Sequence, residues 1–472
     1  MIRGPYGNPP NQPGTAAGRD EPAERLSKAQ EHAGRAARSD PRRAQRVPPH
    51  GPIRSAAKRN PRHPCARAWR ALPLLLLLAM SACSPSRPEA PRAYEYAVPL
   101  GQTFDLAAGR VFTEADEAQR FAGPAAPRLV FLGEHHGDPR SQAFQARFLR
   151  ALVAQGHPVT VALEMFPPQA DPALEAWRQG RLTDAEFVEQ SRWYETWGFP
   201  WSAYRPLFQT IRDDHLPAYG VNVDEAARKA VRESPTGALP PELKAELGDL
   251  DLTVAPHRDA FLDALKEAGD DAGHPSRLAP EDPSFQRMQR VQVLWDTAMG
   301  VRAARLAEAA PPRGVVVAIL GSGHVAYGLG ANLRAARVSA LPRLTVWDDV
   351  AATEDVDAQG RVRVPLGMAD WVRVYPQDDT LQGTPSLAGL KLAAHPSGVR
   401  IEAVRVPPGD ARAVFHAEDI VQAVQGEPVT SPARLRLRVE GLAWNQPAEV
   451  KVLRGGVSTR LTFTPRPSHV DP

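Results

Sequence analysis

Short apolar runs alternate with helix-like segments from residue 128 onwards, and this alternation constrains the fold more than any other feature of the sequence. The apolar runs cover 128–133, 158–166, 216–224, 313–324 and 341–349. Amphipathic segments such as 138–156 and 284–310 separate them. Continuous apolar runs linked by helices are typical of a mainly parallel sheet with helices on both faces. Residues 100–380 are therefore predicted to form one α/β domain, with a helical insertion at 233–283.

The alternation of apolar runs and helix-like segments ends towards the C-terminal end of the sequence. Residues 361–375 predict a hairpin that closes the α/β domain, and a linker is expected at 381–395. Within 396–466, "AEDIVQAVQGEPVTSPARLR" places a glycine at a strand turn before a helix, and "AEVKVLRGGVSTRLTFTP" suggests a terminal hairpin. These stretches resemble a small, β-rich PDZ-like domain. The resemblance implies a peptide partner bound by strand addition, although the usual Gly-Leu-Gly pattern of the carboxylate loop is not visible.

An apolar run at 71–80 follows three arginines and ends in Met-Ser-Ala-Cys at Cys83. The run is shorter than a comfortable membrane span but suits the core of a signal peptide. Small residues before a cysteine resemble a bacterial lipoprotein signal. That resemblance implies a chain attached through a lipid on Cys83 to the cell envelope, facing the periplasm and expected at the outer membrane. The alternative is an ordinary cleaved signal peptide with a chance cysteine.

The segments on either side of the apolar run at 71–80 differ from it in composition. Residues 1–70 are rich in Arg, Pro, Gly and Ala and are predicted to be disordered, or else untranslated, whereas 84–99 resembles a tether. The cysteines are Cys65 and Cys83 alone, so a chain processed at Cys83 has neither a disulfide nor a Cys–zinc site. The net charge of +3 gives no reason to expect a nucleic-acid partner.

Polar side chains stand at the ends of the apolar runs. Glu134, His135 and His136 follow the first run, Glu164 ends the second, Asn222 ends the third and His324 ends the fourth. Ligands of open parallel sheets bind outside the carboxyl ends of the strands, so these side chains predict a site at one edge. Adjacent residues of an extended chain point in opposite directions, so His135 and His136 are not expected to face the same ligand. Asp296, on a polar stripe of the helix at 284–310, is a further candidate for this edge.

Several motifs in their order along 100–380 resemble the ChaN-like family of haem-binding lipoproteins, within the wider Tiki/TraB/erythromycin-esterase-like superfamily. They are "FLGEHHGDP", "VALEMF", "QVLWDTAMG", "VAILGSGHVAYGLG" and "ADWVRVYP". The superfamily pattern pairs two G-x-x-H motifs with a glutamate on the second strand. Here the pattern falls on His136, His324 and Glu164, which favours His136 over His135.

The resemblance implies a membrane-attached protein that binds haem, is linked to iron uptake, and forms a homodimer that shares the haem. Haem iron accepts an imidazole or a phenolate as its axial ligand, so His136, Tyr204 and Tyr327 are the candidates. Haem also needs an apolar wall, which the aromatic residues between 193 and 201 could supply. These aromatic residues are Trp193, Tyr194, Trp197, Phe199 and Trp201.

Two other functions remain open. Superfamily members that resemble metal-dependent proteases or esterases suggest a hydrolase in which His136, Glu164 and His324 bind a divalent metal such as zinc or manganese. Glu134 would then act as the general base on a metal-bound water. The third function is a tether or scaffold whose PDZ-like region engages envelope partners. Non-enzymatic haem binding is favoured over the hydrolase.

Overall fold

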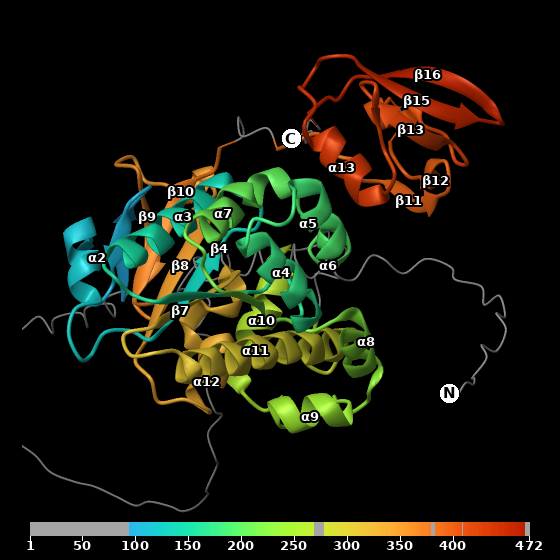
Figure 1. Ribbon diagram of the computed structural model, residues 1–472. Coiled ribbons are helices and arrows are strands. Elements are labelled where there is room, and N and C mark those ends of the chain that lie inside the picture. Colours follow the sequence, from blue (N-terminus) through green and yellow to red (C-terminus); the bar gives the residue numbers. More distant parts are fainter. Residues whose placement is uncertain (1–93, 269–277, 379–382, 408, 468–472) are drawn as a thin grey trace, which may run out of the picture. The chain divides into compact units, whose positions relative to one another are not determined.

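The computed structural model describes residues 94–268, 278–378, 383–407 and 409–467. The expected N-terminal extension, the signal core with Cys83 and most of the tether lie outside these ranges. An eight-stranded sheet in the order β3-β2-β10-β8-β4-β7-β5-β6 forms the core of the α/β domain (Figure 1). The strands are β2 (Thr103–Asp105), β3 (Arg110–Val111), β4 (Leu129–Glu134), β5 (Val159–Leu163), β6 (Ala218–Gly220), β7 (Val315–Gly321), β8 (Arg343–Ala351) and β10 (Trp371–Pro376). The six strands from β10 to β6 are parallel, which confirms the predicted sheet.

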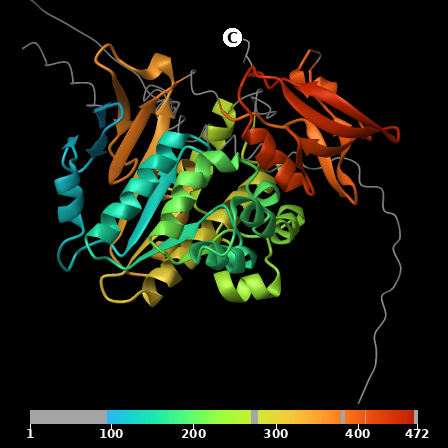
Figure 2. The same cartoon turned by 45° about the horizontal axis from the view of Figure 1, so that its top comes forward.

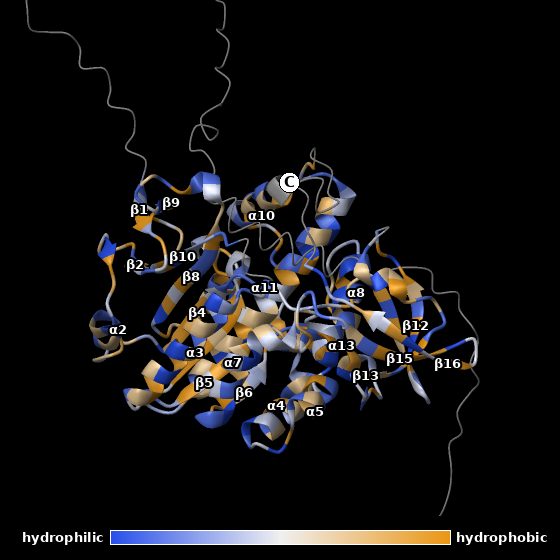
Figure 3. Cartoon of the chain, turned by 90° about the horizontal axis from the view of Figure 1, so that it is seen from above, coloured by the Kyte–Doolittle hydropathy of each residue, from blue (hydrophilic) through white to orange (hydrophobic). Residues whose placement is uncertain are grey.

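Both faces of this sheet are covered by helices. Along β4, Leu129 and Phe131 belong to one apolar cluster while Val130 and Leu132 belong to the other. The first cluster packs on α11 (Pro283–Ala309) and α12 (Ala331–Ala336). The second packs on α3 (Pro139–Ala154) and α7 (Trp201–Asp213), which lie side by side (Figure 2). The central strands β4 and β5 are consequently mostly apolar, as their hydropathy shows (Figure 3).

Local side-chain contacts fix where a helix begins, as the start of α3 shows. Asp138 caps α3 by accepting a hydrogen bond from the Arg140 amide, and Pro139 occupies the first turn. The remaining helices of the domain are α2 (Glu114–Arg120), α4 (Asp171–Arg178), α5 (Asp184–Gln190), α6 (Trp193–Thr196), α8 (Glu225–Glu233), α9 (Pro241–Leu247) and α10 (Ala255–Ala268). Helices α9 and α10 lie in the segment 233–283, which confirms the helical insertion. Within the described ranges, no helix combines the length and apolarity needed to cross a bilayer.

Three local expectations differ from the structure. The end of the expected tether forms β1 (Glu95–Pro99), because it pairs with β9 (Arg361–Pro365) and buries Val98 completely. The hairpin expected at 361–375 is wrong for the same reason: β9 pairs with β1, while β10 joins β8 and β2. The third apolar run yields only the short edge strand β6, since polar contacts hold the residues beyond Gly220.

The C-terminal region is β-rich and has its own core. Its sheet runs in the order β11-β12-β13-β15-β16, with β14 paired to β13. The elements are β11 (Leu390–His395), β12 (Gly398–Val404), β13 (Ile420–Val424), β14 (Glu427–Pro428), α13 (Pro432–Glu440), β15 (Ala448–Arg454) and β16 (Val457–Phe463). Strand β11 therefore begins inside the segment expected to be a linker, because Leu390 is buried in this core.

Candidate functional site

The carboxyl ends of β4, β5, β7 and β8 meet at one edge of the sheet. Glu134 of β4 is level with Gly321 of β7, and Glu164 follows directly after β5. His324 lies in the single 3-10 turn that follows β7. The predicted strand-end residues are thus brought together because the strands are parallel and in register. We call this edge the rim.

Glu134 is the centre of a first buried cluster at the rim. Its Oε1 accepts a hydrogen bond from the Tyr204 hydroxyl at 2.7 Å and pairs with His136 Nδ1 at 2.9 Å. Its Oε2 accepts from the amides of Gln142 at 3.1 Å and Gln145 at 2.6 Å. Both oxygens are therefore occupied, and the carboxylate, which is 2% exposed, anchors His136 and Tyr204.

A second cluster runs from Glu164 into the helices of the opposite face. Glu164 Oε1 lies 3.2 Å from His324 Nε2, and Asp296 Oδ1 of α11 lies 2.6 Å from His324 Nδ1. The other Asp296 oxygen, Oδ2, lies 2.8 Å from Nε2 of His257 in α10. His324 and Asp296 are completely buried. The result is a line of alternating imidazole and carboxylate groups.

The charges of this second cluster shift one another's pKa values. Burial acts to lower the pKa of His324, but the carboxylates of Glu164 and Asp296 outweigh it and raise that pKa to about 10. Burial acts to raise the pKa of Glu164, and the neighbouring imidazoles with the Gly321 amide lower it overall. Burial also acts to raise the pKa of Asp296, and the charge of His324 with the hydrogen bond from His257 lowers it overall. His324 is thus an imidazolium held between two carboxylates.

Gly321 is the point at which the two clusters meet. A Cβ atom at this position would lie 2.6 Å from His136 Nε2 and 3.6 Å from Glu164 Oε2, so a side chain cannot be accommodated there without displacing the imidazole. The other side of the His136 ring faces aromatic side chains, with ring centroids 4.6 Å away for Trp197 and 5.4 Å for Phe199. His136 is 5% exposed and is enclosed on both faces.

His135 turns away from His136, as expected of neighbouring residues. Its Nδ1 lies 2.9 Å from Asp349 Oδ1, at the end of β8. The His135 side chain is 22% exposed, whereas its carboxylate partner is 1% exposed. An imidazole oriented through one ring nitrogen by a buried carboxylate is the arrangement that metal-ligating histidines adopt.

Asn222 and Tyr327 make contacts to the backbone. Asn222 Nδ2 donates to the Glu164 carbonyl oxygen at 3.0 Å, so it fixes the end of β5 at the rim. The amide of Tyr327 donates to the Met368 carbonyl oxygen at 2.8 Å, in the turn before β10.

Sequence reasoning missed His257 and Asp349. Asp349 ends an apolar run, so the rule that identified Glu164 could have found it as well. His257 lies on a helix of the insertion, and nothing in the sequence around it indicates a buried partner. The described residues contain no group of three or more His, Cys, Asp or Glu side chains arranged to hold a metal ion.

Comparison with known proteins gives one family match. A sequence model of the family described as "Haem-binding uptake, Tiki superfamily, ChaN" matches residues 123–334. No curated protein matches the sequence. Among solved structures, ChaN of Campylobacter jejuni, reported with cofacial haem binding, is 17% identical with a TM-score of 0.43, covering 57% of this chain and 95% of its own. A protein from Bacillus cereus is 12% identical with a TM-score of 0.30, covering 60% and 95%. The HtrA-type protease AlgW, solved with a decapeptide, is 19% identical with a TM-score of 0.17, covering 19% and 32%.

The family match spans the elements that build the rim except β8, which follows the matched residues. It includes β4, β5, β7 and α11, and with them His136, Glu164, Asp296 and His324. Over residues 123–334, the α/β domain of this chain therefore matches the sequence model of the ChaN family of the Tiki superfamily.

Proposed function

We propose that the α/β domain binds haem at the rim, with His135 as the axial ligand of the iron. The observation that carries this proposal is the match of residues 123–334 to a family described by haem-binding uptake. The geometry of His135 supports it, because haem iron accepts an imidazole and Asp349 holds this one by its other nitrogen.

Exposure separates His135 from the other candidate ligands. His136 is enclosed between Gly321 and Trp197, and Tyr204 is completely buried. Burial, with the charge of Glu134 and its hydrogen bond, raises the pKa of Tyr204 well above its usual value, which disfavours a phenolate ligand. The His135 side chain, in contrast, is 22% exposed, so a ligand can approach it from solvent.

The aromatic wall is smaller than the sequence suggests. Trp193 and Trp201 are completely buried and Tyr194 is 7% exposed, so these three side chains form part of the domain core. Trp197 and Phe199 are half-buried and border the turn that carries His135 and His136. These two rings are the apolar surface that we assign to the porphyrin.

The test is a titration of the full chain with ferric haem, followed by the Soret band. The wild-type chain is expected to bind with a shifted band, and His135→Ala is expected to lose that shift. His157→Ala is the matched control, because His157 is a buried histidine of the same domain whose ring contacts the Arg313 carbonyl oxygen and Phe121, away from the rim. A His135→Ala spectrum identical to that of the wild type would refute the ligand assignment. Stoichiometric zinc or manganese with an esterase activity lost in Glu134→Gln would instead favour a hydrolase.

We further propose that the chain works in iron uptake from the cell envelope, attached through a lipid on Cys83. The supporting observations are the apolar run at 71–80 and the small residues before Cys83. A lipid anchor of this kind would keep the haem-binding rim close to the membrane from which haem is collected.

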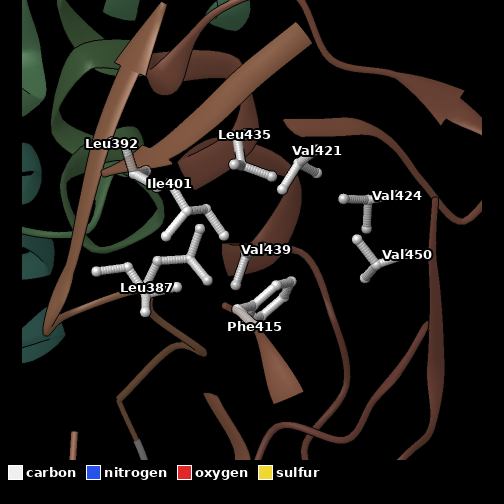
Figure 4. A pocket seen from close by; sticks show the side chains of 10 residues that line it. Leu387, Leu392, Ile401, Phe415, Val421, Val424, Leu435, Val439 and Val450 are labelled. Carbon is white, nitrogen blue, oxygen red and sulfur yellow. The ribbon is translucent and has the colours of Figure 1, made fainter. Parts of the chain in front are cut away.

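For the C-terminal region we propose binding of an extended peptide along β11. Strand β11 is the edge of its sheet, and the apolar side chains between it and α13 line a pocket (Figure 4). Leu390 and Leu392 contribute from the strand, and Leu435 and Val439 from the helix. An edge strand offers backbone hydrogen bonds to an extended peptide, which supports strand addition.

Fluorescence polarisation with labelled decapeptides tests this binding. Leu392→Glu, at a half-buried position of the edge strand, is expected to abolish binding of any peptide that the wild-type chain captures. Val457→Glu is the control, because Val457 is 65% exposed on the terminal hairpin and lines no part of the pocket. Equal loss of binding in both variants would contradict the assignment.

A further inference from the structure

A buried relay of five side chains crosses the α/β domain from α12 to the rim. Arg334 Nη2 of α12 lies 3.4 Å from His257 Nδ1, and His257 Nε2 lies 2.8 Å from Asp296 Oδ2. The relay continues through His324 to Glu164. All five side chains are nearly sealed from solvent, at 2% exposure for Arg334, 6% for His257 and 4% or less for the other three.

Donor and acceptor roles along the relay follow from its two ends. An arginine guanidinium only donates hydrogen bonds, so His257 Nδ1 must accept from Arg334 and carry no proton. His257 Nε2 then carries the proton and donates it to the Asp296 carboxylate. A doubly protonated His257 would turn an N–H towards the guanidinium N–H, and those two donors cannot bond. The positive charges of Arg334 and His324 then balance the negative charges of Asp296 and Glu164.

We propose that His257 is a positioning residue, a neutral imidazole that passes the hydrogen bond of Arg334 to Asp296 and so fixes the turn after β7 beneath the haem ligand. This inference rests on the proposed haem function. Ser322 of the turn donates its hydroxyl to the Asp348 carbonyl oxygen. The next residue, Asp349, holds His135. The relay is therefore connected to His135, the proposed ligand, through the turn after β7 and the end of β8.

The chemistry of the relay favours a functional role over simple packing. Buried ion pairs can often be replaced by apolar side chains without loss of stability, so a core of this size does not need them. What the relay provides is direction: its carboxylates, with Gln292 beside His324 Nδ1, hold the imidazole of His324 and its turn in one orientation. No apolar contact would define that orientation as narrowly.

Nitrogen-15 NMR of the full chain, labelled at its histidine rings, tests the relay without haem. The His257 signal is identified as the one absent from H257Q. We expect the ring proton of His257 on Nε2, which faces Asp296, and none on Nδ1, which faces Arg334. A protonated Nδ1 would overturn the proposal.

Haem titration of the same chains tests the positioning role. H257L removes both hydrogen bonds and is expected to weaken haem binding about tenfold or more, with the Soret maximum unchanged because His135 remains. H257Q keeps one donor and one acceptor and is expected to bind as the wild type does. H157L, at a buried histidine outside the relay, is the control for the loss of an imidazole.

Each outcome has a distinct meaning. Wild-type affinity in H257L would overturn the positioning role, and so would an H257Q as weak as H257L. A wild-type chain that binds no haem would refute the proposed function itself. In that case the NMR result alone decides whether the relay exists as drawn.

Discussion

Tyr204 holds both ends of the short turn that presents His135. Its hydroxyl donates to Glu134 Oε1 at 2.7 Å and accepts from the Gly137 amide at 3.0 Å. The residues between these two contacts are His135 and His136. A phenol placed in this way stiffens the turn, and its complete burial keeps it away from a haem.

Tyr204→Phe separates these roles. The change leaves the Gly137 amide without its acceptor and is expected to cost about 1–3 kcal/mol of unfolding free energy. Urea denaturation measures that cost, and the Soret maximum of the haem complex is expected to stay where it is in the wild-type chain. A shifted maximum would mean that Tyr204 is itself the axial ligand.

Asp348 makes stability depend on pH. Burial raises the pKa of its carboxyl to about 8, against the opposing effects of Ser141 and Arg373. Because the folded chain keeps this proton while the unfolded chain loses it, stability falls as the pH rises from about 4 to about 8, by at most about 1.4 kcal/mol per pH unit. Asp348→Asn should remove that loss, so its stability relative to the wild type should rise over this range and level off above pH 8. If chemical denaturation gave the same difference in unfolding free energy between Asp348→Asn and the wild type at every pH, the raised pKa of Asp348 would be contradicted.

At the scale of single residues, the sequence predicted which groups meet but not which are exposed. Glu164 and His324 could be placed together because both follow apolar runs of one parallel sheet. The choice between His135 and His136 depends on how the chain turns after β4 and on where Phe199 lies, and both are set by tertiary packing. His257 could not be found, since its partner lies 39 positions away on another helix.

Strand ends and glycines together shape the site at the scale of elements. Gly330 precedes α12, where a Cβ atom would lie 2.1 Å from the His324 carbonyl oxygen and 2.9 Å from Asp296 Oδ1. The first of these neighbours is backbone, which cannot move aside as a side chain can. Close approach of α12 to the turn after β7 therefore requires a glycine.

Gly330→Ala is expected to lower the unfolding free energy by about 3 kcal/mol, at the upper end of the usual cost of overpacking. Thermal or urea denaturation measures the loss. Gly383→Ala is the matched control, because a Cβ atom there meets nothing within 4 Å, and its effect should stay within about 0.5 kcal/mol. Equal stability of the two variants would show that the turn can relax.

Long elements were predictable and short ones were not. Helices α3 and α11 follow from their caps and periodic apolar residues, and the strands at 128–133 and 313–324 follow from continuous apolar runs. Strand β1 was not predicted, because its pairing with β9 joins residues more than 250 positions apart, which no local sequence pattern encodes.

At the scale of the whole molecule, the α/β domain and the C-terminal region each enclose their own apolar core. The fold class could be predicted because the α/β part and the β-rich part each have their own periodicity. The apolar pocket of the C-terminal region could not, since it is lined by residues drawn from Leu387 to Val450.

The proposed attachment to the envelope is also tested on the whole chain. Mass spectrometry of the N-terminal peptide from membrane-purified protein is expected to find Cys83 at the N-terminus with a lipid mass added. Cys83→Ser should then release the protein into the soluble fraction. An unmodified Cys83 behind a different N-terminus would indicate an ordinary signal peptide.

The most direct test of haem binding is to identify what travels with the native protein. Protein purified gently from its own cells, without added cofactor, is assayed for porphyrin by the pyridine haemochromogen method and for metals by mass spectrometry. We predict haem iron in the wild-type protein and its loss in His135→Ala but not in His157→Ala. A stoichiometric divalent metal with no porphyrin would contradict haem binding at the rim.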